Sequence, residues 1–161
     1  MNRTRKHVTG FSLIELVIVV VIIGIIGAIA IPRMSRGSAG AADSALVGDL
    51  SVLRNAIDLY AAEHGGAFPT SANIASQLTS LTKADGSVAG SGQGKADGFI
   101  FGPYVRKVPP LPVGTNKGKA NFTDTLGTAD FGWFYNAATG EVKANLAASE
   151  KDEAGTAYQD Y

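Results

Sequence analysis

The chain has 161 residues, 14 basic and 14 acidic side chains, 45% hydrophobic residues and no cysteine. This length suits one ordinary domain with an appendage, and the lack of cysteine excludes disulfides and thiolate metal or catalytic sites. The balanced charge, with no basic cluster beyond the first ten residues, argues against a nucleic-acid partner.

A short basic segment precedes a long apolar one at the start of the chain. Residues 1–10 carry three Arg or Lys side chains and no acid, whereas residues 11–31 contain only Ser12 and Glu15 as polar side chains. Twenty-one helical residues at about 1.5 Å rise span roughly 32 Å, close to the ~30 Å hydrocarbon core of a bilayer. We therefore predict a transmembrane helix over residues 11–33, with the basic leader in the cytoplasm and the rest on the opposite side.

The boundary between these segments reads Gly10-Phe11-Ser12-Leu13-Ile14-Glu15-Leu16. An ordinary secretory signal places its small cleavage residue after the apolar run, whereas Gly10 lies before it. This heptapeptide and the apolar run that follows resemble the type IV pilin and type II secretion pseudopilin superfamily. The resemblance implies that a prepilin peptidase removes residues 1–10 and methylates the new N-terminus at Phe11. The mature chain then has 11 basic against 14 acidic residues, a net charge of −3.

Glu15 is an acid within an apolar segment, where a carboxylate costs about 2.5 to 3.5 kcal/mol at the bilayer centre and less near its edge. It lies about 6 Å along the helix from Phe11, whose amine becomes a cation after cleavage. Pairing the Phe11 amine of one copy with Glu15 of the next removes both charges from lipid and sets an axial register. As an isolated acid, Glu15 would instead reach toward the membrane interface.

Small residues occupy the later turns of the apolar segment, at Gly24, Gly27, Ala28 and Ala30. They allow helices to approach closely, or they reflect the ordinary composition of membrane helices. Pro32 lacks an amide hydrogen and therefore kinks or ends the membrane helix. The resemblance implies that the segment between Gly24 and Pro32 unwinds in a filament.

Residues 34–64 change from a uniformly apolar to a periodic pattern. Apolar side chains recur every three or four residues, at Leu46, Leu50, Leu53, Ile57 and Tyr60. This spacing predicts an amphipathic helix that continues the first one and ends at Gly65-Gly66. A helix from the anchor through Ala62 would reach nearly 80 Å at about 1.5 Å per residue. Such a rod suits a filament better than a globular core.

Residues 65–161 are expected to form a soluble head. Together with the long helix they predict an α+β, pilin-like fold in which the helix packs on a small antiparallel sheet. Ser71 is expected to cap a short helix in which Ile74, Leu78 and Leu81 share a face.

The remaining head elements follow from small residues and β-favouring runs. Residues 83–98 predict an exposed mobile loop, and the proline-broken segment of residues 99–114 predicts one edge strand. Residues 131–135 and 141–145 flank a glycine-ended loop and predict a hairpin. The polar tail after Leu146 is expected to fray.

Phe68-Pro69 and Gly102-Pro103-Tyr104 resemble the major pseudopilin of type II secretion more than a type IV pilin, as does the lack of a C-terminal cysteine pair. The usual Asp-Pro-Trp-Gly-Asn-Pro-Tyr segment of that family is replaced by residues 110–116. Major pseudopilins often hold calcium between their final strands, and Asp124 and Asp130 precede the hairpin here. Since the matching motif is absent, calcium stays an open alternative, and we assign no metal ligand and no other cofactor.

A membrane-tethered hydrolase is the main alternative from another class. His7 leaves with the leader, His64 stands alone at a helix end, and neither Ser51 nor Ser76 lies in a nucleophile motif. Trp133-Phe134-Tyr135 could form an aromatic ligand patch, but in a strand these side chains alternate faces and favour sheet packing. We therefore predict no enzymatic activity.

The resemblance implies a structural subunit that polymerises into a helical homopolymer, most like the major pseudopilin that helps drive protein export in type II secretion. Expected partners are prepilin peptidase, the inner-membrane assembly platform and minor pseudopilins, with no nucleic acid. We expect a single-pass protein of the bacterial inner membrane with a periplasmic head, and a filament in the periplasm or at the cell surface. A type IV pilin for adhesion, motility or DNA uptake and a tethered, non-polymerising binding domain are the alternatives.

Overall fold

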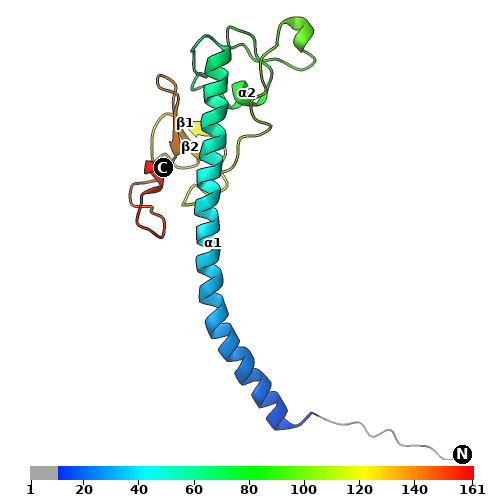
Figure 1. The fold of residues 1–161 in the computed structure, drawn as a ribbon, viewed down its shortest axis with the longest axis vertical. Helices are drawn as coiled ribbons and strands as arrows, with labels where there is room; N and C mark the ends of the chain where they lie inside the picture. Colours follow the sequence, from blue (N-terminus) through cyan, green and yellow to red (C-terminus); the bar gives the residue numbers. More distant parts are fainter. Residues whose placement is uncertain (1–10) are drawn as a thin grey trace, which may run out of the picture. The chain divides into compact units, whose positions relative to one another are not determined.

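The computed structural model describes the backbone of residues 11–161 and the side chains of residues 11–29 and 38–161. The chain divides into two compact units, residues 1–38 and 39–161. One helix, α1 (Leu13–Glu63), contributes to both units (Figure 1). The second unit also contains α2 (Ile74–Thr79), η1 (Lys95–Asp97), β1 (Phe122–Thr123), β2 (Trp133–Asn136), β3 (Glu141–Ala144) and η2 (Tyr158–Asp160).

In the first unit, α1 begins at Leu13 and its backbone stays helical past Pro32. Of the two outcomes predicted for Pro32, an end of the helix is therefore wrong. The large apolar side chains between Leu13 and Ile29 are all exposed, from 45% for Val17 to 81% for Leu13. Among the described residues, no helix combines the length and the apolar character needed to cross a membrane.

In the second unit, α1 buries one stripe of side chains. The five positions predicted from the periodicity are exposed by 2% or less: Leu46, Leu50, Leu53, Ile57 and Tyr60. The stripe packs with residues of the sheet, among them Trp133 and Val142. The α+β fold, a long helix packed on a small sheet, is thereby confirmed. The helix ends where Gly65 and Gly66 adopt φ of 66° and 90°, left-handed values that favour glycine.

The sheet has the strand order β1-β2-β3. Strands β2 and β3 form the predicted hairpin and pair antiparallel, with Asn136 opposite Glu141. Strand β1, however, pairs parallel with β2, so the sheet is mixed rather than wholly antiparallel. The physical reason is the loop of residues 124–132, which returns the chain to the end of the sheet where β1 starts, so both strands run the same way.

Two local predictions in the head are wrong. Asn73 rather than Ser71 occupies the position before α2, and Leu81 lies beyond the end of that helix. The edge strand expected within residues 99–114 is reduced to one isolated bridge between Phe101 and Thr82. Prolines in that segment lack the amide hydrogen that a ladder requires.

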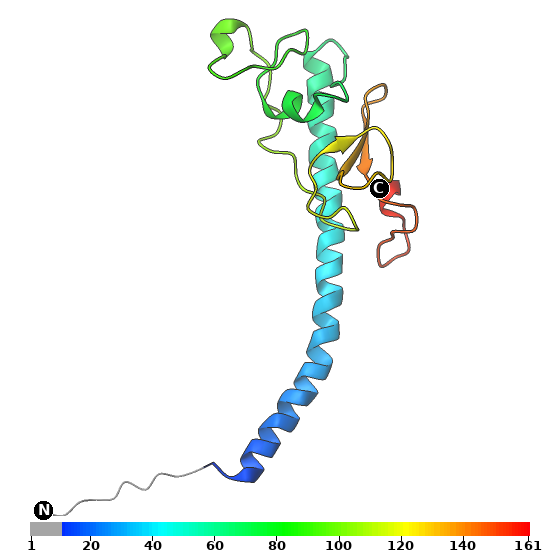
Figure 2. The same ribbon diagram turned by 180° about the vertical axis from the view of Figure 1, so that it is seen from behind.

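The tail after Leu146 folds back onto α1 and is not frayed. The Tyr158 hydroxyl donates to the Asp43 carboxylate at 2.8 Å, and the Arg54 guanidinium donates to the Tyr161 carbonyl oxygen at 2.6 Å. Helix η2 also lies close to β3, and Figure 2 shows the tail beside the sheet from behind. Polar contacts to α1, together with the packing of Tyr158 and Tyr161 against the core, hold this segment.

Candidate processing and assembly site

The start of α1 carries the residues predicted for processing and assembly. Gly10 lies outside the described residues, and the Phe11 side chain is 84% exposed. The Ser12 amide donates to the Glu15 carboxylate at 2.9 Å, and the Leu16 amide donates to the Ser12 carbonyl at 3.2 Å. The structure therefore brings Phe11, Ser12 and Glu15 together at one end of the helix.

Ser12 and Glu15 have the spacing of a capping box, in which an acid three residues into the helix accepts from the amide of the cap residue. The acid also lies at the end where the helix dipole is positive. Reasoning from the sequence missed this contact, although the pattern Ser-x-x-Glu predicts it. A carboxylate has about four acceptor positions, so Glu15 retains capacity for a donor from outside its own chain.

Among the described residues, nothing outside the neighbouring backbone of α1 packs against Gly24. A Cβ built at Gly24 or at Gly27 would meet no heavy atom within 4 Å. The missing side chains leave room for a neighbouring helix at these positions. The Pro32 side chain lies outside the described residues, and the backbone between Gly24 and Pro32 is helical in this single chain. The unwinding expected in a filament stays a prediction.

A family model described as the prokaryotic N-terminal methylation motif matches residues 5–31. The chain carries the N-terminal signal of type IV pilin-like prepilins. The match covers Gly10, Phe11, Glu15 and Gly24, and a prepilin signal implies processing by prepilin peptidase and assembly into a filament in general. No curated protein and no solved structure matches the chain at a significant level.

Asp124 and Asp130, the two acids that precede the β2-β3 hairpin, bind different partners within the head. Lys119 donates to the Asp130 carboxylate at 2.6 Å, and this hydrogen bond lowers the pKa of Asp130. Asp124 accepts from the Thr125 hydroxyl at 3.1 Å. Within the described part of the chain, no three histidine or acidic side chains are grouped in a way that could hold a metal ion. Calcium therefore stays the open alternative that the sequence left, with no ligand assigned.

The loop between β1 and β2 is held by a buried amide. The Asn145 side chain, fully buried, donates to the Thr128 and Phe131 carbonyl oxygens at 2.7 and 2.8 Å and accepts from the Gly127 amide at 2.7 Å. The sequence did not reveal this role, because nothing local distinguishes Asn145 from other polar residues. Both the amide nitrogen and the amide oxygen of the Asn145 side chain are thus hydrogen-bonded to main-chain groups of this loop.

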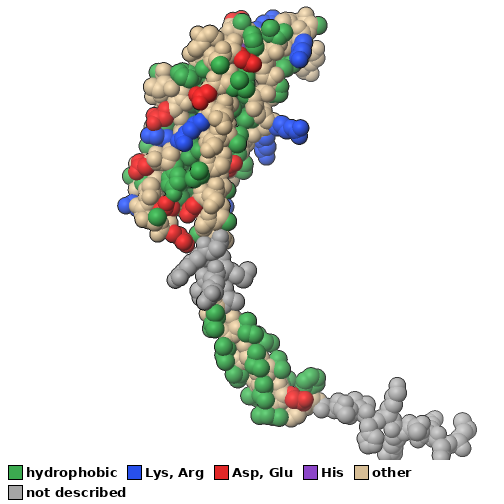
Figure 3. Space-filling view, in the orientation of Figure 1, with side chains coloured by type: hydrophobic (Ala, Val, Ile, Leu, Met, Phe, Trp, Pro, Cys, Tyr) green, Lys and Arg blue, Asp and Glu red, His purple; other side chains and the backbone are tan. Residues whose placement is uncertain are grey.

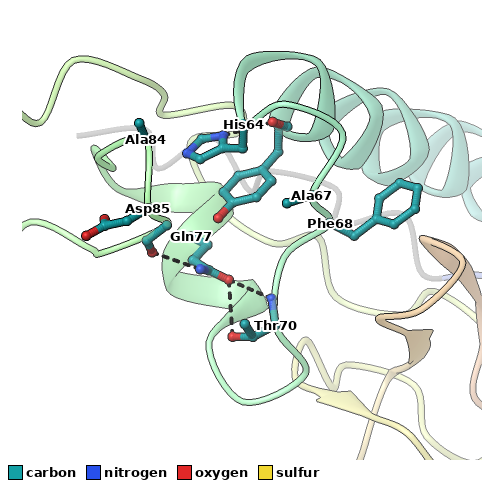
Figure 4. A pocket seen from close by; sticks show the side chains of 9 residues that line it. His64, Ala67, Phe68, Thr70, Gln77, Ala84 and Asp85 are labelled. Atoms are coloured by element: carbon teal, nitrogen blue, oxygen red, sulfur yellow. Dashed lines mark hydrogen bonds between the residues drawn. The ribbon is translucent and has the colours of Figure 1, made fainter.

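His64 lies beside a cavity of about 280 Å³ at the end of α1 (Figure 4). Its ring stacks on Tyr60 with centroids 3.8 Å apart. Nδ1 lies 2.8 Å from the Tyr60 carbonyl oxygen, and Nε2 lies 3.0 Å from the Lys83 carbonyl oxygen. Across the cavity, Gln77 joins the Thr70 amide to the Gly86 carbonyl oxygen, at 2.8 Å each. His64 therefore anchors the loop after α2 rather than standing in water.

The aromatic run in β2 packs the core, as predicted for a strand. Trp133 and Tyr135 are buried, and Phe134 faces the other side of the sheet and is half-buried. The Trp133 indole donates to the Pro109 carbonyl oxygen and the Tyr135 hydroxyl to the Pro69 carbonyl oxygen, both at 2.8 Å. Burial raises the pKa of the Tyr135 hydroxyl. Two of the three rings are thus unavailable to a ligand.

Proposed function

We propose that this chain is a filament subunit, cleaved after Gly10, methylated at Phe11 and polymerised with copies of itself as the major pseudopilin of a type II secretion system. The observation that carries the proposal is Glu15, hydrogen-bonded at the start of an exposed apolar helix, one turn from Phe11 and inside a prepilin motif. No part of the proposed role is enzymatic.

The assembly step follows from the charges at this helix end. Cleavage converts the nitrogen of Phe11 from an amide into an amine that is cationic at neutral pH. Glu15 accepts from the Ser12 amide and keeps further acceptor positions. In a medium of low dielectric constant, an amine from one copy and a carboxylate from the next cost less together than apart. The pair then sets the axial register of neighbouring subunits.

The same proposal assigns residues 11–33 to a single-pass anchor in the bacterial inner membrane. The leader of residues 1–10 lies in the cytoplasm and the head in the periplasm, consistent with the basic residues before the apolar segment. Lipid before assembly, and neighbouring copies after it, cover the exposed side chains of residues 13–29. The assembly platform and minor pseudopilins are the proposed partners in this step, and Gly24 and Pro32 the proposed points of flexibility.

The central test replaces Glu15 by Ala and uses Ile14→Ala, an exposed neighbour on the same turn, as its control. Ile18→Cys with Ile25→Cys can crosslink copies of the chain in cells. Since the chain lacks cysteine, no native thiol of the chain competes for these crosslinks. We expect both alanine variants to reach the membrane, and only Glu15→Ala to lose the crosslinked ladder and the filaments. Normal ladders and filaments from Glu15→Ala would refute the proposed role of Glu15.

A second test separates the pseudopilin from the alternative of a type IV pilin. Phe68-Pro69, Gly102-Pro103-Tyr104 and the lack of a cysteine pair favour the pseudopilin. Loss of the chain should then abolish export of secreted enzymes while adhesion, motility and DNA uptake persist. The opposite pattern would favour a surface pilin, and loss of neither group of functions would favour a tethered binding domain.

A further inference from the structure

The second unit carries its C-terminal tail along one flank of α1. Arg54 donates to the Tyr161 carbonyl oxygen at 2.6 Å, and Asp43 accepts from the Tyr158 hydroxyl at 2.8 Å. Asp43 precedes Arg54 by eleven residues, which at about 100° per residue places the two within roughly 20° of each other around the helix. These two contacts therefore fix the tail to a single flank.

The loop of residues 102–109 lies on the opposite flank. Its Tyr104 hydroxyl donates to the Glu63 carboxylate at 2.7 Å. Glu63 follows Arg54 by nine residues, and nine steps of about 100° place it roughly 180° away around the helix. Figures 1 and 2 agree, because the part of the chain just after η1 and the C-terminal end lie on different sides of α1 in both views. Nearer β1 the chain crosses to the side of the tail, where Thr115 donates to the Glu150 carboxylate.

The loop flank has unpaired positive charge. Arg106 and Lys107 are exposed neighbours. The ion pairs present among the described side chains are Lys119 with Asp130 and Lys143 with Glu141, so neither Arg106 nor Lys107 takes part in one. Scattered exposed charges need no explanation, but two adjacent cations without a partner on one flank create a local positive patch.

The tail flank has an excess of unpaired negative charge. Residues 147–161 contain four acids and one base, and Asp152 and Glu150 are occupied by hydrogen bonds within the unit. Glu153 and Asp160 are exposed, and no side-chain hydrogen bond or ion pair engages either carboxylate in residues 38–161. In Figure 3 most of the acidic side chains in view lie along one edge of this unit, together with several cationic ones, while further cationic side chains protrude from the opposite edge.

We propose that these flanks meet between copies, with Arg106 and Lys107 of one head against Glu153 and Asp160 of its neighbour. The proposal rests on the filament proposed above and adds the contact between heads. The two surfaces differ, so the contact is heterologous, and a heterologous contact that does not close on itself produces an open helical polymer. Complementary charge fixes which flanks meet and excludes pairing of like flanks.

The test reverses the charges in pairs. Arg106→Glu with Lys107→Glu should lower the yield of filaments on the order of tenfold at low salt, since like charges would then face each other. Glu153→Lys with Asp160→Lys should do the same, and combining all four changes should restore assembly. Lys95→Glu with Lys117→Glu, the same change of charge at other exposed positions, is the matched control and should assemble normally. An unchanged Tm for each head shows that folding is intact.

Cysteine pairing supplies a second readout in the full-length chain. Pro110→Cys and Ala154→Cys lie at exposed positions in or next to the two proposed surfaces, and a non-reducing gel distinguishes a link between two copies from a link within one chain by its mass. Oxidation should link one copy to the next. If the Ile18 and Ile25 cysteines form ladders but these do not, and charge reversal has no effect, the contact between heads is refuted and the filament stands. If no ladder forms through residues 18 and 25 either, the filament itself fails.

Discussion

The two portions of α1 both carry large apolar side chains, but only one portion buries them within the chain. In the second unit, Leu53 is fully buried against the head. In the first unit, Ile18 is 50% exposed, like its large apolar neighbours. Burying a side chain of this size stabilises by about 1.5 to 3 kcal/mol. One portion therefore obtains this stabilisation inside its own chain, and the other does not obtain it there. In the function proposed above, lipid and further copies supply it.

The largest expected effect contrasts equivalent truncations in the two portions. Leu53→Ala should lower the free energy of unfolding of the head by about 2 to 5 kcal/mol, because it leaves a cavity in the core. Ile18→Ala should change it by less than about 0.5 kcal/mol. Thermal unfolding of the detergent-solubilised chain, followed by near-ultraviolet circular dichroism, measures both. Similar losses from the two variants would show that the first unit contributes to folding of the head.

A second prediction concerns polar rather than apolar packing in the head. Asn145→Ala removes a buried amide and leaves main-chain groups of Gly127, Thr128 and Phe131 without that partner. We expect a loss of about 1 to 3 kcal/mol and faster hydrogen exchange of the Gly127 amide. Asn55→Ala, at an exposed position of α1, should leave both quantities unchanged. Equal effects of the two changes would contradict the role of the amide.

The third prediction tests the attachment of the tail. Burial, together with the hydrogen bond to Asp43, raises the pKa of Tyr158 to about 12, against about 10 in an unfolded chain. The neutral phenol is favoured in the folded state, so its contribution is complete below pH 10 and is lost as pH rises through 12. Tyr158→Phe should cost about 0.5 to 1 kcal/mol at pH 7. Urea unfolding at several pH values should show this difference shrinking between pH 10 and 12, and a difference that stays constant would contradict the assignment.

The smallest effect is expected at Asp49, a half-buried acid on α1. Burial raises its pKa, so the folded state binds this proton more tightly than the unfolded state does. As pH rises and the carboxyl ionises, the folded state therefore loses stability relative to the unfolded state. At pH 7 the ionised carboxylate therefore lowers stability, and Asp49→Asn should raise it by a few tenths of a kcal/mol. The gain should vanish below about pH 4, whereas Asp58→Asn, at an exposed position of the same helix, should give none. Urea unfolding measures both.

Features encoded locally were predictable from the sequence. The stripe of α1 follows from a spacing of three and four residues, and the β2-β3 hairpin from a glycine-ended loop between two β-favouring runs. The N-terminal methylation motif was equally accessible, because Gly10, Phe11 and Glu15 lie within six residues of one another. The hydrogen bond between the Ser12 amide and Glu15 was also predictable, because the pattern Ser-x-x-Glu is present in the sequence.

Features that depend on distant partners were not predictable. Strand β1 has two residues and pairs parallel with β2. It is too short to show an alternating pattern, and no tight turn connects it to its partner, so the sequence does not predict it. The polar contacts of the tail with α1 go to Asp43 and Arg54, which lie 115 and 107 residues away from their partners in the chain. A side chain that makes one long-range hydrogen bond looks like any exposed residue in the sequence. Only the folded arrangement distinguishes Tyr158 from an ordinary tyrosine of a polar tail.

The position of η2 also affects how the protein behaves when it is crowded. An outer strand with free main-chain groups invites other chains to add a strand and aggregate. Strand β3 is such an outer strand, and its Val142 carbonyl oxygen lies 3.4 Å from the Arg54 guanidinium while η2 packs close by. The opposite edge, β1, is only two residues long. When heads crowd together, strand pairing between the sheets of different heads is therefore disfavoured. Any regular arrangement of heads would depend on surfaces other than the strand edges.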